Sequence, residues 1–299
     1  MKLLHINGSH ARNVEFIIRA CKLFNIEYYH TDDTFPVDNS YDIIWSPSTW
    51  INPDNYPTSK IIFGPQFFVF PNPCDSLYKE SKSEHGLRCI YVCLSDWVAK
   101  LYDEFVPASL QIIPHVAIPF GLDIESREKT KPYEYDCIIY YKARHPSILD
   151  FCEKFCTEKG LRHKIYSYGS YTRDDYINTL YKTRFVIWVG SHESQGFALE
   201  ECLATNTPIF LYDVKSMKDE YTNGYYTYNS YSEKLLATSA PYWNDQCGLK
   251  VYSNEEFIHR FSEFIDLLDT YTPGEYVKST LTDEICFQRF LDALKIKVS

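Results

Sequence analysis

Three features are missing from this sequence of 299 residues, and each absence excludes a class of protein. No run approaches the roughly 18 consecutive apolar residues that a membrane-spanning helix needs. The ten cysteines form no CxxC pair and no Cys/His cluster with zinc spacing, so no structural metal is expected. Basic residues are also few, because 30 Lys and Arg face 40 Asp and Glu. The resulting formal charge of −10 disfavours nonspecific binding to nucleic acid or to an anionic membrane.

The residues that are present are typical of a globular protein with a sizeable core. Apolar residues make up 45% of the chain and charged residues 23%. Isolated cysteines such as Cys137 lie in apolar runs, which predicts reduced thiols packed as small core residues. The first apolar stretch, "MKLLHINGSH", is too short for a signal peptide. We therefore expect a soluble, cytoplasmic protein without a transmembrane segment.

Short apolar runs alternate with amphipathic segments along most of the chain. This alternation predicts an α/β fold with mostly parallel sheets covered by helices on both faces. In the first half, strands are expected at 2–6, 41–46, 60–64, 89–95 and 109–115, and helices at 13–24 and 95–105. In the second half, strands are expected at 135–141, 162–169, 184–190 and 208–213, and helices at 147–160, 173–183, from about 195, 254–271 and 282–296.

A polar stretch at 122–135 interrupts the alternation and is interpreted as a linker. We predict an N-terminal domain over 1–125 and a C-terminal domain over 126–280. A last helical segment, 281–299, is expected to pack back toward the N-terminal domain. Ligands of open parallel sheets bind beyond the carboxyl ends of the strands, so the loops there and the cleft between the domains are the default site.

The loop and helix at 191–208, "SHESQGFALEECLATNTP", attract attention because acids flank an apolar run. We expect the helix to start near Gln195, with Ser194 as its N-cap, and to end at Asn206 before a proline. Gly196 leaves the first turn bare, so a ligand can approach the backbone N–H groups. A helix N-terminus of this kind is suited to binding a phosphate.

Three glutamates surround this predicted phosphate site. Glu193 before the helix and Glu201 within it can accept hydrogen bonds from sugar or ribose hydroxyls. Glu200 lies about 100° around the helix from Glu201 and is expected to be a bystander on a solvated edge. The simpler alternative is that Glu193 only complements the helix dipole and that Glu200 and Glu201 are both solvated.

The spacing of Glu193 and Glu201 matches the E-x7-E arrangement of retaining GT-B glycosyltransferases. The "ESQG" form resembles a variant found in glycosyltransferase-family-4-like proteins. Five further segments resemble the same group in the same order: "KIIFGPQFFVFPNP", "YVCLSDWVAKLYDEF", "IIPHVAIPFGLD", "IIYYKAR" and "TPGEYVKSTLT". The resemblance implies a GT-B architecture, with two Rossmann-like domains facing across a cleft.

The resemblance also implies catalytic roles. Lys142, with Arg144 close by, would neutralise the donor diphosphate as it departs, because the leaving group gains charge in the transition state. Glu193 would hold hydroxyls of the donor sugar and Glu201 those of the ribose. The alternative for Lys142 is an ordinary solvated strand end.

Further residues are implied on the donor and acceptor sides. Gly169 would keep a loop open near the nucleotide, and Ser194, Gln195, Gly196 and Phe197 would hold the phosphate or the sugar. On the N-terminal domain, Gly8 and Ser9 would close over the diphosphate. Each glycine could instead belong to a plain turn. Many relatives carry a histidine near the fourth N-domain strand, where this chain reads "GPQ", so Gln66 and His10 are the acceptor-side candidates.

Taken as implied by the resemblance, the activity is retaining transfer of a sugar from a nucleotide-diphosphate sugar to an acceptor hydroxyl. The acceptor would be a glycan or a lipid- or protein-linked sugar, and neither metal nor other cofactor would be needed. The alternative is a catalytically silent GT-B-like module that binds a glycan or nucleotide or scaffolds a partner. An epimerase is disfavoured by the small size and the "ESQG" form. A Rossmann oxidoreductase is disfavoured because "NGSH", not GxGxxG, follows the first strand.

Overall fold

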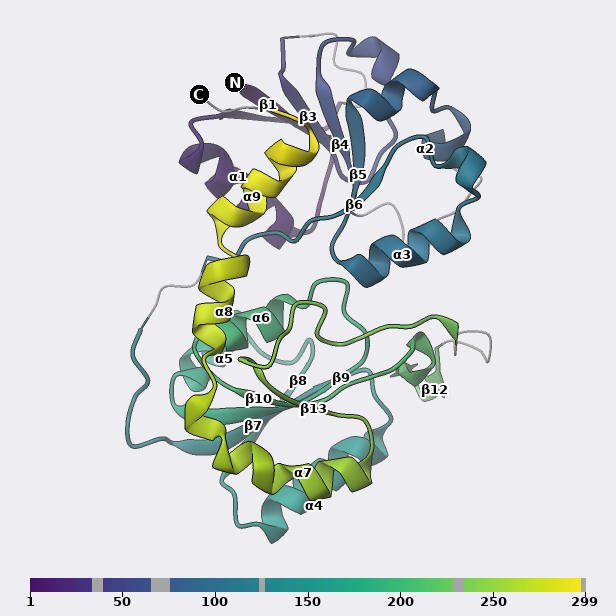
Figure 1. Cartoon of the computed structure of the whole chain (residues 1–299). Helices are drawn as coiled ribbons and strands as arrows, with labels where there is room; N and C mark the ends of the chain where they lie inside the picture. The colour runs from purple at the N-terminus through teal and green to yellow at the C-terminus, as the bar shows by residue number, and fades with distance from the viewer. Residues whose placement is uncertain (34–39, 66–75, 124–126, 228–233, 297–299) are drawn as a thin grey trace. The chain divides into compact units, whose positions relative to one another are not determined.

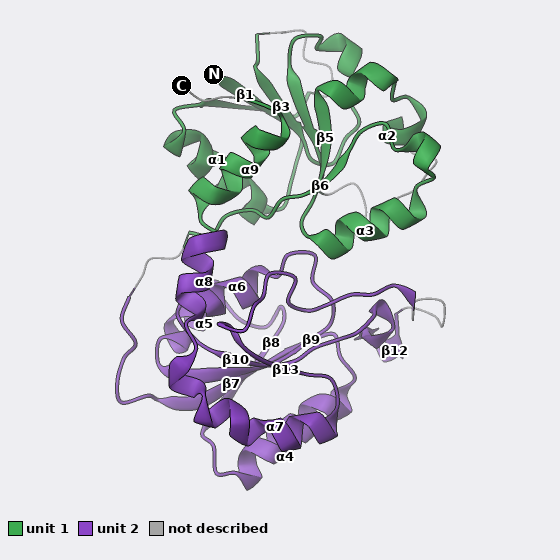
Figure 2. Ribbon diagram, viewed as in Figure 1, with its two compact units in different colours: residues 1–123, 281–299 green, residues 124–280 purple. Residues whose placement is uncertain are grey.

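The computed structural model describes residues 1–33, 40–65, 76–123, 127–227 and 234–296 (Figure 1). The chain divides into two compact units (Figure 2). Unit 1 consists of residues 1–123 and 281–299, and unit 2 of residues 124–280. Each unit is built on its own parallel sheet, so the predicted α/β class with parallel sheets is confirmed.

Unit 1 contains a six-stranded sheet in which every pairing is parallel. From the first strand the chain moves outward to the second and then returns to the other side of the first. The strand order therefore reverses between β1 and β3, which is the point where open α/β sheets bind ligands. The strands lie in the order β2 (Glu27–Thr31), β1 (Lys2–Ile6), β3 (Ile43–Ser46), β4 (Lys60–Phe63), β5 (Cys89–Cys93) and β6 (His115–Ala117).

The helices of unit 1 include the last one of the chain. Phe16 of α1 stacks on Phe120 with ring centroids 5.0 Å apart and lies 6.0 Å from Phe290 of α9. Arg19 of α1 donates two hydrogen bonds to the Asp283 carboxylate at 2.7 and 2.9 Å. Aromatic burial, worth roughly 1.5–3 kcal/mol per fully buried side chain, thus holds the C-terminal helix in unit 1. The helices are α1 (Ala11–Leu23), α2 (Ser76–Lys79), α3 (Asp96–Phe105) and α9 (Asp283–Ala293).

Unit 2 contains a five-stranded sheet that is also parallel throughout. Its central strand, "TRFVIWVG", is buried along almost its whole length, because helices cover both faces of a parallel sheet. Here the strand order reverses between β7 and β9. The strands lie in the order β13 (Gly248–Val251), β10 (Ile209–Tyr212), β9 (Thr183–Gly190), β7 (Tyr135–Lys142) and β8 (His163–Ser167).

Helices cover the two faces of the unit 2 sheet, as Figure 1 shows. One face packs against α4 and α7, where Phe155, Phe257 and Phe261 interlock edge to face. Within the described ranges, no helix is both long enough and apolar enough to cross a bilayer. The helices are α4 (Pro146–Glu158), α5 (Arg173–Leu180), α6 (Phe197–Ala204), α7 (Asn254–Asp266) and α8 (Pro273–Thr280), and a hairpin is formed by β11 (Tyr221–Thr222) and β12 (Tyr225–Tyr226).

One predicted strand is displaced along the chain. The run 109–115 was expected to be extended, but a short 3-10 helix covers Ala108–Leu110 and β6 begins only at His115. Pro114 has no N–H to donate to a sheet, so the paired strand starts after it. The structure also adds β2, β13 and α8, which the apolar pattern did not predict.

Candidate functional site

The carboxyl ends of β7 and β9 meet at the point where the strand order of unit 2 reverses. Lys142 is the last residue of β7, and the loop 191–196 follows β9. The N–H of Ser191 donates to the carbonyl of Lys142 at 2.9 Å, which joins the two loops. A ligand of this sheet is expected at this edge, so its side chains are the first candidates for a site.

An ion pair occupies this edge. The Lys142 ammonium donates to a carboxylate oxygen of Glu193 at 2.7 Å, and the two side chains are only 20% and 14% exposed. Burial raises the pKa of Glu193 above its usual range, and the charge of Lys142 opposes that rise. The Lys142 ammonium also lies 4.4 Å from the ring centroid of Tyr168, which is exposed. The structure thus brings together two of the predicted catalytic residues.

The backbone beside Lys142 is in an unusual conformation. Ala143 has φ of +48°, in the left-handed region that residues other than glycine seldom adopt. Its carbonyl accepts the N–H of Tyr221 at 2.9 Å, which helps to hold the turn. Such a conformation costs on the order of 1–3 kcal/mol and is found preferentially at functional sites. It turns the chain sharply between Lys142 and the next cation, Arg144.

Arg144 is directed at the backbone of the sheet. Its guanidinium donates to the carbonyls of Gly190 at 3.0 Å and Tyr212 at 3.1 Å, and the residue is buried. These bonds tie together the ends of β9 and β10. The cation therefore has a structural role behind the strand ends, while its expected role at a diphosphate stays a prediction.

Helix α6 begins two residues later than its sequence suggests, at Phe197 instead of Gln195. The N-cap is Gly196, with φ of +91°, and Ser194 lies in the loop before it, so the prediction of Ser194 as the cap was wrong. Glycine adopts this left-handed conformation without strain. A Cβ at position 196 would also lie 3.4 Å from Cβ of Glu193. The first N–H groups of a helix have no carbonyl partner within it, which is why helix N-termini bind anions. Phe197 is the first residue of the helix.

Glu200 is buried, which contradicts its interpretation as a solvated bystander. It has no exposed surface, and the Gln195 side-chain amide donates to its carboxylate at 2.9 Å. Gln195 is itself buried. A buried carboxylate needs such hydrogen bonds because its desolvation is costly. The pair braces the loop 191–196 against the first turn of α6, so Gln195 has a positioning role in the loop.

Glu201 is also buried but faces a different partner. It accepts a hydrogen bond from Arg173 of α5 at 2.6 Å, and the Arg173 side chain is 42% exposed. The Glu201–Arg173 pair is thus held by two helices on one side of the sheet.

Gly169 lies in the turn after β8 and has φ of +81°. Apart from its chain neighbours, no atom lies within 4 Å of the position that a Cβ would take there, so the space beside this turn is open.

Two residues near Lys142 were not singled out from the sequence. Nδ1 of His192 lies 3.1 Å from the Glu220 carboxylate, and both side chains are mostly buried. Burial, followed by the charge of Lys142, lowers the pKa of His192 to about 4. Burial raises the pKa of Glu220. The sequence could have pointed to His192, because it directly precedes Glu193 in the loop after a buried strand.

The remaining predicted residues belong to unit 1. The carbonyl of Gly8 accepts a hydrogen bond from the Ser48 hydroxyl at 2.8 Å. The ring of His10 is the N-cap of α1 and accepts a backbone N–H of its first turn at 3.3 Å. Ser9 lies between them in the loop after β1. Gln66 lies outside the described residues.

One group of side chains in unit 1 has the donor atoms of a metal site. Ligand atoms of Asp54, Glu84 and His85 lie within 4.8 Å of one another, in the part of the chain that the structure describes. The Lys82 ammonium contacts Asp54, and together with His85 it lowers the pKa of that carboxyl to about 2. A resident cation of the chain therefore already neutralises Asp54.

Comparisons with known proteins identify a fold for this chain but no family. No protein-family model matches the sequence, and no curated protein matches it. Among solved structures, the apo form of the lipopolysaccharide outer core galactosyltransferase WaaB superposes with a TM-score of 0.54 at 11% identity, over 99% of both chains. The chain has the GT-B fold. At this identity the likeness establishes the fold alone, so the activity has to be argued from the site.

Two other solved structures are less similar to this GT-B chain. A mutant of S. aureus TarM in complex with fondaparinux, alpha-GlcNAc-glycerol and UDP has a TM-score of 0.49 at 11% identity, over 88% of this chain and 57% of TarM. A D-isomer specific 2-hydroxyacid dehydrogenase from Lactobacillus delbrueckii ssp. bulgaricus has a TM-score of 0.22 at 11% identity, over 71% of each chain. Neither superposition is close enough to support an argument about this protein.

Proposed function

We propose that this protein is a retaining glycosyltransferase that moves a sugar from a nucleotide-diphosphate sugar to an acceptor hydroxyl. The observation that carries the proposal is the half-buried Lys142–Glu193 pair at the strand-order reversal of unit 2. Both residues were expected from the resemblance, Glu193 from the E-x7-E spacing and Lys142 from the "IIYYKAR" segment, and the pair lies at the edge where such sheets bind ligands.

Lys142 is suited to the leaving group. A nucleoside diphosphate gains negative charge as the bond to the sugar breaks, and a fixed ammonium at that place stabilises the transition state. The N–H groups at the start of α6 can add the partial positive charge of a helix N-terminus. With donor bound, Lys142 would exchange part of its interaction with Glu193 for one with a phosphate oxygen.

Glu193 is suited to the transferred sugar. Its carboxylate accepts hydrogen bonds, and sugar hydroxyls donate them. The buried setting that raises its pKa also makes each such bond stronger than it would be in water. Glu193 is then a positioning group that holds the ring while Lys142 acts on the phosphate.

Glu201 is suited to the ribose. The bond from Arg173 at 2.6 Å fixes the Glu201 carboxylate in one orientation, so an oxygen can accept from a ribose hydroxyl without further ordering. Binding that needs little ordering of side chains retains more of its favourable free energy.

The proposed mechanism also has to account for the acceptor proton and for the charge of the leaving group. In transfer with retention, the acceptor oxygen forms its bond to C1 on the face from which the diphosphate leaves. The departing phosphate oxygen takes the acceptor proton there, so no separate general base is required. Lys142 and the helix N-terminus supply the positive charge that a divalent cation supplies elsewhere, and we therefore propose metal-independent transfer.

A screen of donors tests the activity. The full chain is incubated with UDP-, GDP- and ADP-sugars in the presence of EDTA, and the nucleotide released as the sugar is transferred to water is measured. At least one donor should be turned over, and Lys142→Ala and Glu193→Ala should each lower the rate by about 100-fold or more. Lys182→Ala, which removes a more exposed ion pair with Glu134 in the same unit, is the matched control.

The outcomes of this screen are distinct. No release from any donor, or full activity in both site variants, would contradict the proposed transferase. Donor binding without turnover would indicate a catalytically silent binding module instead. The anomeric configuration of the product, read by NMR, decides between retention and inversion.

A further inference from the structure

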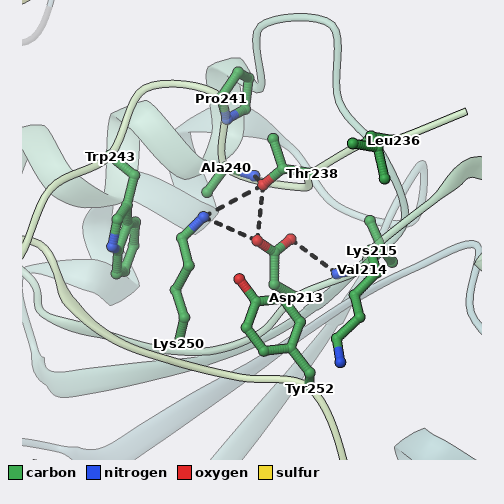
Figure 3. Close-up of a pocket in the computed structure, with 11 residues that line it drawn as sticks. Asp213, Val214, Lys215, Leu236, Thr238, Ala240, Pro241, Trp243, Lys250 and Tyr252 are labelled. Atoms are coloured by element: carbon green, nitrogen blue, oxygen red, sulfur yellow. Dashed lines mark hydrogen bonds and ion pairs between the residues drawn. The ribbon is translucent and has the colours of Figure 1, made fainter. Parts of the chain in front are cut away.

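An open depression of about 610 Å³ lies beyond the carboxyl ends of β10 and β13 in unit 2 (Figure 3). Its volume is in the range of small-molecule sites. Charged residues from both strand ends line it, together with aromatic residues and an exposed leucine, Leu236. The roles proposed above for Lys142, Glu193 and Glu201 do not use any of these side chains.

Hydrogen bonds to one buried carboxylate hold the floor of the depression together. Asp213 is buried and accepts hydrogen bonds from the Ser239 N–H at 2.8 Å, the Thr238 hydroxyl at 2.8 Å and the Lys250 ammonium at 2.9 Å. The charges of Asp213 and Lys250 therefore offset each other. Within the described part of the chain, Lys250 donates to Asp213 and Thr238, which leaves a third N–H for a ligand.

Aromatic rings form the walls. Trp243 and Tyr252 lie on either side of the Lys250 side chain in Figure 3. The Lys250 ammonium is 5.5 Å from the indole centroid of Trp243, and the Lys215 ammonium is 5.1 Å from the ring centroid of Tyr252. Tyr252 is 38% exposed, so a ligand can reach its ring.

This combination matches a pyranose ring. One face of such a ring presents C–H groups, whose positive hydrogens are attracted to the negative face of an aromatic ring. Its edge presents hydroxyls that both donate and accept hydrogen bonds. The indole N–H, the tyrosine hydroxyl and the ammonium of Lys250 are suitable partners for those hydroxyls.

The depression adjoins the proposed donor site through one shared residue. The carbonyl of Thr238, whose hydroxyl faces the floor, accepts the N–H of Glu193 at 3.0 Å. We propose that the depression binds a pyranose ring of the acceptor glycan, next to the loop that holds the donor sugar. That this ring belongs to the acceptor rests on the proposed function, whereas the binding of a pyranose ring in the depression does not.

Binding is measured without any donor. Saturation-transfer NMR on the full chain uses the methyl glycosides of glucose, galactose, mannose and N-acetylglucosamine at millimolar concentration. At least one should receive saturation, mainly on its ring C–H protons. Trp243→Ala should reduce that signal at least five-fold, whereas Trp243→Phe should retain part of it. Tyr226→Ala, an exposed tyrosine on β12, should change nothing.

Three results would overturn the inference: no saturation of any glycoside, an unchanged signal in Trp243→Ala with a wild-type melting temperature, or loss of the signal on addition of UDP, GDP or ADP. The last would assign the depression to the donor. If Trp243→Ala lowers the melting temperature, Tyr252→Phe replaces it, with weakened saturation expected. A protein that binds a glycoside at Trp243 but turns over no donor would contradict the transferase proposal and leave this site intact.

Discussion

The two sheets reverse their strand order in the same way but differ in what lies at the reversal. In unit 1 the loops after β1 and β3 are joined by a neutral bond, from the Asn7 amide to the Thr49 hydroxyl at 2.7 Å. In unit 2 the loops after β7 and β9 are joined by an ion pair of the same length, between Lys142 and Glu193. The same strand order thus places a neutral hydrogen bond at the reversal in unit 1 and an ion pair at the reversal in unit 2.

This difference separates what the fold provides from what the side chains provide. A reversal of strand order opens a crevice in any doubly wound sheet. An amide–hydroxyl bond of net worth about 1 kcal/mol is easily exchanged for a ligand hydroxyl. A half-buried ammonium such as that of Lys142 can stabilise a phosphate far more strongly. The charged reversal of unit 2 is therefore the better place for a nucleotide diphosphate, as proposed above.

The largest expected effect is a loss of stability when a residue that directly follows a strand loses its polar side chain. Asp213→Ala should lower the free energy of unfolding by about 3 kcal/mol, because it leaves Lys250, only 23% exposed, without its carboxylate. Asn7→Ala in unit 1 should cost about 1 kcal/mol. Urea unfolding followed by circular dichroism measures both. Equal losses would remove the energetic contrast between the charged and neutral strand ends.

The second effect is acid sensitivity in unit 1. Burial, with a smaller contribution from His30, lowers the pKa of His5 to about 4, although Asp32 opposes the shift. Between pH 6.5 and pH 4 the unfolded chain binds a proton that the folded chain does not, so acid lowers stability. His5 should contribute a loss of up to about 3 kcal/mol over that range.

His5→Phe should flatten this pH dependence. The substituted ring can still stack on Trp45, whose ring centroid lies 4.3 Å from that of His5. Unfolding free energies measured from pH 7 to pH 4 in both proteins provide the test. His192 in unit 2 has the same sign, so part of the dependence should persist. An equally steep dependence in His5→Phe would show that His5 does not cause it.

The smallest effect distinguishes two neighbouring glutamates on α6. Glu200→Ala leaves the buried Gln195 amide without its carboxylate and should cost roughly 1–3 kcal/mol of stability. Glu201→Ala breaks a pair with the half-exposed Arg173 and should cost less than about 1 kcal/mol, while weakening nucleotide binding several-fold. Melting curves and nucleotide titrations rank the two variants, and the reverse ranking would contradict their assigned roles.

Much of the fold was predictable because its signals are local. Alternating apolar and amphipathic segments indicated parallel sheets, and the buried run of β9 is typical of a central strand. The helix was predicted to end at Asn206 before a proline; α6 ends at Ala204 with Thr205 as its C-cap, and Asn206 follows with φ of +53°, in the left-handed region. Cys137 was predicted to be a core residue and is fully buried.

The errors arose where distant parts of the chain decide. Glu200 is buried because α6 packs inside unit 2. The apolar pattern of an eight-residue helix shows one buried face, but it does not show that another helix also covers the opposite face. The contacts of Arg144 could not be predicted either, because only the folded sheet places two carbonyls beside its guanidinium, and its role at a diphosphate stays a prediction. The edge strand β2 is mostly exposed, so its sequence lacks the apolar run that marks a buried strand.

Calorimetric titration of the full chain with UDP, GDP and ADP tests the central claim most directly. We predict that at least one of them binds, that Lys142→Ala weakens this binding by about ten-fold or more, and that Lys182→Ala leaves it unchanged. Absence of binding by all three nucleotides, or equal affinity in Lys142→Ala and the wild type, would contradict the assignment of the nucleotide diphosphate to the charged strand ends of unit 2.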